Sequence, residues 1–100
     1  MQIRKEMLNG FGIAHGGITY SLADSALAFA SNSFGQKAVS IETSISHVIS
    51  LVENDIIIAQ VFQQSNTNKI AIYTIDILNQ STKQKVALFK GTVYKTDKTW

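Results

Sequence analysis

Residues 9–34, NGFGIAHGGITYSLADSALAFASNSF, limit the possible folds of this chain more than any other stretch. Apart from one histidine, the only formal charge in it is Asp24. No proline or further glycine follows the glycine pair before Gly35, so we predict a helix from about Gly16 to Ser33. Apolar residues at helical spacing occupy two faces of it: Ile18, Leu22, Ala26 and Phe29 on one, and Tyr20, Ala23, Leu27 and Ala30 on the other. A helix that is apolar nearly all round is expected to be buried.

The length of the chain bears on how such a helix could be covered. With 100 residues, we expect one domain over residues 1–100. A chain this short leaves a large share of its surface exposed, so a fully buried helix is hard to cover from within one copy. We therefore expect a homo-oligomer.

Composition excludes several functional classes. The net charge of +2 gives no case for nucleic acid as a partner, and the absence of cysteine excludes disulfides and thiolate chemistry. His15 and His47 are the only histidines and lack a close metal-ligand spacing, so we expect no metal. The N-terminus lacks an apolar core of signal-peptide length, and no apolar run approaches membrane-spanning length. We therefore expect a cytoplasmic protein without a membrane partner.

The remainder of the chain has the pattern of β structure. We predict a short strand at residues 2–8 and four strands after the helix, at residues 38–50, 56–64, 70–78 and 85–95. In the first long strand, Val39, Ile41 and Ile45 share the apolar face. Gly91 falls inside the last strand, which indicates a close approach by another element, and the helix is the obvious candidate. These elements predict an α+β fold in which an antiparallel sheet wraps around one long helix.

The start of the helix and Asp24 are the best candidates for chemistry. Backbone amides at Gly16 and Gly17 have no side chains in the way and could stabilise the oxyanion of an acyl transfer. Asp24 could be a general base or a nucleophile toward an ester or thioester, and Asn9 could orient a water or hold a carbonyl. The alternatives stay open: an Asp in a helix is commonly solvated or ion-paired, and His15 could simply cap the turn.

Basic residues are frequent late in the chain. They alternate with apolar residues and are Lys83, Lys85, Lys90, Lys95 and Lys98. Such a row is typical of a solvated strand face, and binding of an anionic ligand is the alternative.

Motifs along the whole chain carry a family resemblance. They are Asn9-Gly10, His15-Gly16-Gly17 and Ser21-Leu22-Ala23-Asp24, followed by Ala30-Ser31-Asn32-Ser33, Ala38-Val39, Asn54-Asp55 and the run from Asn79-Gln80 to Gly91-Thr92. This set resembles the hotdog-fold acyl-CoA thioesterases, with the phenylacetate-degradation (PaaI-like) branch the best match. The sequence departs from the family where a strand-ending proline is missing around residues 48–51. Asn54-Asp55 also replaces the usual Gly-Asp turn.

The resemblance implies a fold, an assembly and a site. The fold would be the hotdog fold, paired into dimers and often into dimers of dimers, with no metal or redox cofactor. The amide of Gly16 would polarise the thioester carbonyl, and Asp24 of the neighbouring subunit would act as base or nucleophile. Asn9 would assist at the carbonyl or water. Substrate contacts are expected from His15, Gly17 and Ser40, and from Lys69 for the CoA phosphates.

We therefore predict an acyl-CoA thioesterase that hydrolyses an aryl- or short- to medium-chain acyl-CoA. One alternative is a non-catalytic hotdog module that binds acyl groups or other ligands. A hotdog dehydratase is a second alternative, which would need a His–carboxylate pair. His15 and Asp24 are the obvious partners, but they lie more than two helical turns apart, which makes this alternative a poor one.

Overall fold

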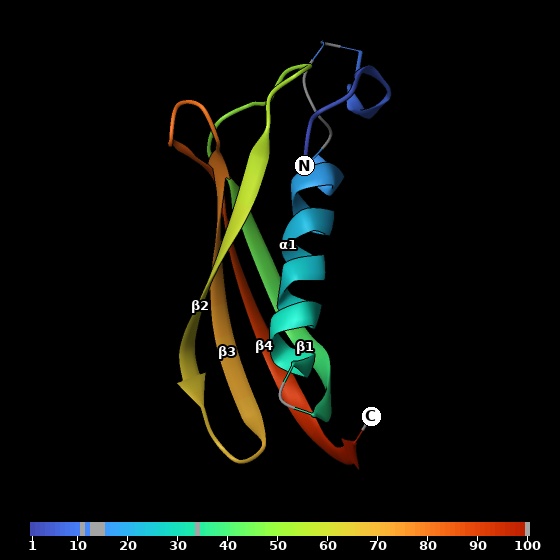
Figure 1. The fold of residues 1–100 in the computed structure, drawn as a ribbon, viewed down its shortest axis with the longest axis vertical. Helices are drawn as coiled ribbons and strands as arrows, with labels where there is room; N and C mark the ends of the chain where they lie inside the picture. The colour runs from blue at the N-terminus through green and yellow to red at the C-terminus, as the bar shows by residue number, and fades with distance from the viewer. Residues whose placement is uncertain (11, 13–15, 34, 100) are drawn as a thin grey trace.

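The computed structural model describes residues 1–10, 12, 16–33 and 35–99. One helix lies along one face of an antiparallel four-stranded sheet, and the strand order is β1-β4-β3-β2 (Figure 1). The elements are η1 (Lys5–Met7), α1 (Gly16–Asn32), β1 (Gln36–His47), β2 (Ile57–Asn66), β3 (Ile70–Asn79) and β4 (Lys85–Thr99). The predicted α+β arrangement is confirmed.

The two central strands, β3 and β4, supply most of the core. Their inward residues alternate as predicted and are all buried: Ala71, Tyr73, Ile75 and Ile77 on β3, and Ala87, Phe89, Gly91 and Val93 on β4. The register places Ile75 opposite Phe89, so large side chains from neighbouring strands pack together on one face. Each fully buried large side chain contributes about 1.5–3 kcal/mol relative to exposure.

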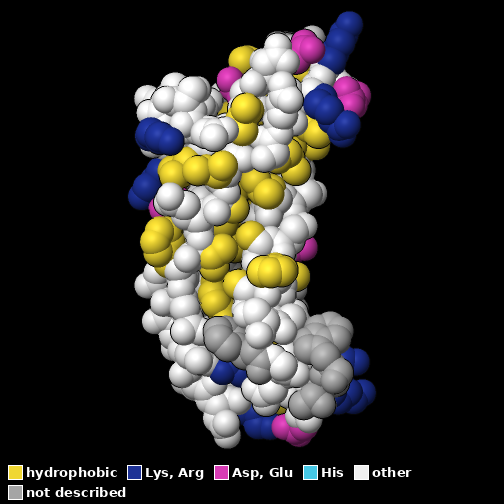
Figure 2. Space-filling view, in the orientation of Figure 1, with side chains coloured by type: hydrophobic (Ala, Val, Ile, Leu, Met, Phe, Trp, Pro, Cys, Tyr) yellow, Lys and Arg dark blue, Asp and Glu magenta, His cyan; other side chains and the backbone are white. Residues whose placement is uncertain are grey.

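Helix α1 covers this core with one stripe only. The buried residues recur at every fourth position and are Thr19, Ala23, Leu27 and Ser31. Phe29, on another face, is 82% exposed. The prediction that the helix is buried all round is therefore wrong for a single chain, because the sheet reaches only one side of it. Figure 2 shows hydrophobic side chains gathered on the open side of the molecule, between α1 and β2.

Gly91 marks the closest approach of α1 to the sheet. A Cβ atom built on Gly91 would lie 3.0 Å from Cδ1 and 3.2 Å from Cγ of Leu27. Leu27 is buried against this bare stretch of β4. The predicted close approach of the helix at Gly91 is confirmed.

The N-terminal segment does not form the predicted strand at residues 2–8. Gln2 makes an isolated antiparallel bridge with Ile56, and the chain then turns into η1. Ile3 is fully buried, and its backbone N–H donates to the carbonyl of Asp55 at 2.7 Å. The backbone after Ile3 turns away from its partner, so the pairing ends after a few bonds.

Strand β1 is an edge strand. It begins two residues before the predicted range 38–50 and ends three residues before the end of that range. Val39 and Ile41, which were expected to share an apolar face with Ile45, are 52% and 58% exposed. The pairing with β4 shifts register between Ser40 and Glu42, which interrupts the alternation of faces there. An exposed edge strand with apolar side chains is a natural place for pairing with another chain.

The turn from α1 to β1 fixes where the edge strand begins. Gly35, which limits the predicted helix, has a φ of +93°, in the left-handed region that favours glycine. The side-chain oxygen of Asn32 accepts the N–H of Ala38 at 2.8 Å, and its amide donates to the carbonyl of Ala28 at 2.8 Å. Asn32 therefore joins the end of the helix to the start of β1.

Candidate active site

The first turn of α1 offers backbone amides to a ligand. Gly16 and Gly17 begin the helix, and the first amides of a helix have no carbonyl partner within it. The helix dipole adds partial positive charge here, and no acidic side chain of the first turn neutralises it. A Cβ atom at Gly17 would have no heavy atom of the described residues within 4 Å. The N–H groups at the start of α1 can therefore donate to a ligand oxygen that gains negative charge. His15 lies outside the described residues.

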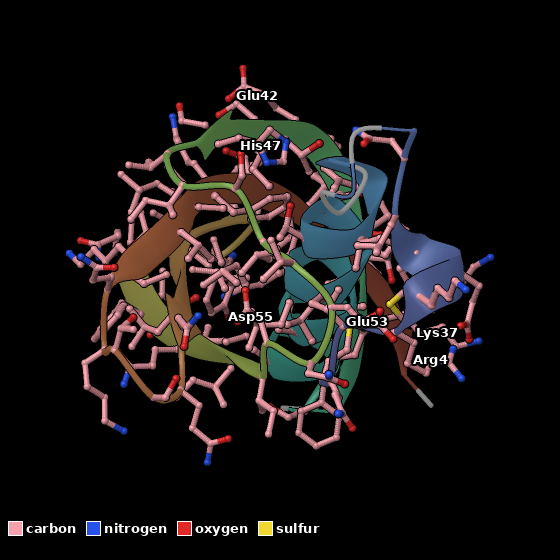
Figure 3. The ribbon with its side chains drawn as sticks, turned by 90° about the horizontal axis from the view of Figure 1, so that it is seen from above. Arg4, Lys37, Glu42, His47, Glu53 and Asp55 are labelled. Carbon is pink, nitrogen blue, oxygen red and sulfur yellow. The ribbon has the colours of Figure 1, made fainter. Side chains whose placement is uncertain are left out.

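The sequence interpretation considered His47 only as a metal ligand, but the structure places it against the helix start. Its Nδ1 lies 3.2 Å from the Oγ1 of Thr19, and that hydroxyl donates to the carbonyl of Gly16 at 3.0 Å. Figure 3 shows His47 on the inner side of β1, facing the start of α1, whereas Glu42 points outward. The only available signal was the odd-numbered position that His47 shares with Ile45 on the inner face.

Asp24 lines a cavity between the second half of α1 and the sheet. The cavity has a volume of about 310 Å³, and its walls are formed by Asp24, Leu27, Ala28, Ser31, Ala38, Val39, Ser40 and Val93. Asp24 is half-buried, and among the described residues it makes no ion pair. The structure therefore brings Asp24 and Ser40 together, as two oxygen-bearing side chains in one cavity with a mixed polar and apolar lining.

Gly16 and Asp24 do not meet within one chain. They lie on the same helix, eight positions apart, so the rise of an α-helix separates them by about 12 Å along its axis. One carbonyl group cannot touch both. The two halves of the predicted catalytic pair are therefore separate in the single subunit.

The remaining predicted residues lie outside the Asp24 cavity. Asn9 is half-buried, and its carbonyl accepts the N–H of Gly12 at 3.1 Å. Lys69 lies in the β2–β3 hairpin, which is at the end of the sheet opposite the start of α1 (Figure 1). Its Nζ lies 3.4 Å from Asp97 and 5.9 Å from the centre of the Tyr94 ring. The hydrogen bond to Asp97 raises the pKa of Lys69 above its ordinary value.

The other late lysines behave as a solvated strand face. Lys85 pairs with Asp76 at 3.4 Å, and Lys90 pairs with Glu42 at 3.8 Å. These contacts use part of the positive charge that an anionic ligand would need. Exposed pairs of this kind contribute little to stability.

Among the described residues, no group of three or more His, Cys, Asp or Glu side chains is arranged to hold a metal ion. No described helix has the length and hydropathy needed to cross a membrane.

Comparisons with known proteins place this geometry in a family. A family model described as Thioesterase superfamily matches residues 11–86. A putative esterase of Archaeoglobus fulgidus is 41% identical over 97 residues, which are 97% of this chain and 62% of that relative. Acyl-coenzyme A thioesterase PaaI of Escherichia coli is 36% identical over 95 residues, covering 95% of this chain and 67% of PaaI. The chain thus spans only about two thirds of the length of these relatives.

Solved structures give the same result. The structure of E. coli PaaI, from the phenylacetic acid degradation operon, matches with a TM-score of 0.94 and 34% identity over 99% of this chain and 71% of that one. The Streptococcus mutans protein smu.793, solved bound to acetyl CoA, matches with a TM-score of 0.92 and 27% identity over 100% of this chain and 80% of that one. The hotdog fold expected from the motifs is confirmed, and the chain belongs to the thioesterase superfamily, with a PaaI-like arrangement.

Proposed function

We propose that this protein hydrolyses the thioester of an aryl- or short- to medium-chain acyl-CoA. One observation carries the proposal: a half-buried carboxylate, Asp24, lines a small cavity and has no ion-pair partner among the described residues. Keeping a carboxylate in such surroundings costs free energy, which favours a chemical role for it. The names of two relatives add support, since one is an acyl-coenzyme A thioesterase and another was solved with acetyl CoA.

In the proposed reaction, Asp24 and the start of α1 act on opposite sides of the thioester. The carbonyl oxygen accepts the N–H of Gly16, which stabilises the negative charge that develops on it. Asp24 takes a proton from water as the water oxygen bonds to the carbonyl carbon. The carbon–sulfur bond then breaks, and the CoA thiolate takes up the proton, which leaves a carboxylic acid and free CoA. Alternatively, Asp24 attacks the carbonyl itself, and water hydrolyses the resulting anhydride.

The proposed site needs two copies of the chain. Gly16 and Asp24 lie about 12 Å apart along one helix, so the pair that acts on one carbonyl has to come from different subunits. The edge strand β1 is the proposed interface, because it carries the exposed apolar residues Val39 and Ile41 and one wall of the Asp24 cavity. Ser40, on the same strand, would hold the water or the carbonyl in place. Asn9 and His15 would contact the substrate near the glycine pair.

The decisive experiment is Asp24→Asn, tested with a panel of CoA thioesters from acetyl to phenylacetyl. This change keeps the size of the side chain but removes the base, so kcat should fall by about 10²–10⁴. The melting temperature should stay equal or rise, because the burden of a partly buried carboxylate is removed. A matched control is Asp76→Asn, since Asp76 is also half-buried but pairs with Lys85. This control should keep kcat and lose some stability.

Two results would contradict the proposal. An Asp24→Asn variant that is active but less stable would show that Asp24 is a structural ion-pair partner. A wild-type protein that binds CoA esters and turns none of them over would instead be the non-catalytic binding module.

A further inference from the structure

We propose that His47 is a positioning residue, which holds the first turn of α1 in the orientation needed to bind the thioester carbonyl. This inference rests on the proposed function above, because it assigns a task to a side chain that the proposed chemistry does not use. Its contacts with Thr19 and Gly16 carry the inference.

The imidazole of His47 contacts the helix start in two ways. Its Nδ1 lies 3.2 Å from the hydroxyl oxygen of Thr19, and its other edge lies against Gly16. A Cβ atom built on Gly16 would come 3.0 Å from Nε2 and 3.3 Å from Cε1 of the ring. A side chain at residue 16 would press on the ring and require it to shift by a few tenths of an ångström, so glycine leaves room for this contact.

The hydrogen bonds among His47, Thr19 and Gly16 run in one direction, which follows from the hydrogens that each group carries. The carbonyl of Gly16 can only accept, so the Thr19 hydroxyl donates its single hydrogen to it at 3.0 Å. The hydroxyl then has no hydrogen left for the ring, and Nδ1 of His47 has to be the donor to Thr19. Thr19 is only 5% exposed, so water competes little for this hydroxyl.

The helix start needs support from outside the helix. Two successive glycines lose more backbone entropy on ordering than other residues do. The bond from Thr19 fixes the carbonyl of Gly16, and this carbonyl shares a rigid peptide plane with the N–H of Gly17. By holding Thr19, His47 restricts the amide of Gly17, and by lying against Gly16 it limits the room in which the amide of Gly16 can turn.

The anchor of His47 is the sheet itself. His47 is the last residue of β1 and is paired with Ala87 of β4. The next two N–H groups, of Val48 and Ile49, both donate to the carbonyl of Val86, at 2.9 and 3.2 Å. The hydrogen-bonded end of β1 therefore fixes where the ring lies, and the ring in turn limits the movement of the glycine pair of the helix.

The activity test uses three variants of the full chain. His47→Ala removes both contacts, and kcat should fall about tenfold with KM within twofold, since a small misplacement of catalytic groups lowers the rate strongly. His47→Asn places an amide donor close to the position of Nδ1, so it should recover most of the lost kcat. Ser46→Ala is the control, because Ser46 points to the opposite face of β1 and should leave kcat unchanged. Melting temperatures should stay within a few degrees of wild type, because His47 is exposed.

A second readout does not need turnover. The backbone amide of Tyr20 bonds to the carbonyl of Gly16 in the first turn of α1, so it should exchange with deuterium several-fold faster in His47→Ala than in wild type, with recovery in His47→Asn. Thr19→Val removes the hydroxyl that His47 contacts. In the double variant Thr19→Val/His47→Ala, the fall in kcat should therefore be smaller than the product of the falls in the two single variants.

The inference is overturned if His47→Ala keeps kcat within twofold of wild type, or if His47→Asn fails to restore it. If wild type hydrolyses no thioester of the panel, the proposed function fails, and amide exchange alone judges the positioning. Unchanged exchange at Tyr20 in His47→Ala then overturns it.

Discussion

Replacing Gly91 by alanine tests how closely α1 packs on the sheet. The added methyl group would lie 3.0 Å from Cδ1 and 3.2 Å from Cγ of Leu27, which is too close for carbon atoms at rest. Leu27 is buried and cannot swing into solvent. Overpacking of this kind costs about 1–3 kcal/mol. For a domain of this size, each kcal/mol lowers Tm by roughly 4–8 °C, so we expect a fall of about 4–24 °C.

A double-mutant cycle identifies Leu27 as the cause. Leu27→Ala alone should destabilise by about 2–5 kcal/mol, because it leaves a cavity. The double variant Gly91→Ala/Leu27→Ala should be more stable than the sum of the two effects by about 1 kcal/mol, since the new methyl group occupies part of that cavity. Gly10→Ala is the control: a Cβ atom there meets no described atom within 4 Å.

Chemical unfolding followed by circular dichroism, at one fixed protein concentration, measures the stability of wild type and of the four variants. The concentration has to be fixed because association of copies shifts the apparent stability. A Gly91→Ala variant as stable as wild type would refute the reasoning, and so would strictly additive effects in the cycle.

Two further predictions concern assembly and CoA binding. Light scattering of wild type at micromolar concentration should show an oligomer built on a dimer. The variant Ile41→Lys, on the exposed edge strand, should shift the protein toward a single chain of 11.0 kDa. A purely monomeric wild type would contradict this. Lys69→Gln should raise KM for CoA esters at low salt and leave kcat unchanged, whereas Asp97→Asn, which frees Lys69, should lower KM. Because the pKa of Lys69 is raised above its ordinary value, its charge and this KM effect should persist from neutral to mildly alkaline pH, and an effect that vanishes there would count against it.

The sequence by itself determined the elements whose signals are local. The helix beginning at Gly16 and the left-handed turn at Gly35 were readable, since glycine positions and turn chemistry act over a few residues. The inward faces of β3 and β4 were readable because strands buried on one face alternate strictly. Gly91 pointed to a close approach, and the motifs around Asp24 pointed to the family.

Only the tertiary structure decided features that depend on distant partners. Val39 and Ile41 have the same pattern as core residues, but β1 lies at the sheet edge and carries a register shift, so they are exposed. Which face of α1 is buried depends on where the sheet lies. The helix is apolar nearly all round, so its sequence pattern does not indicate that face. The contact between His47 and the helix start joins the two ends of the α1–β1 unit, and no local periodicity records such a meeting. Pairing and packing across the chain set these features, because the free energy of burial depends on three-dimensional neighbours rather than on sequence spacing.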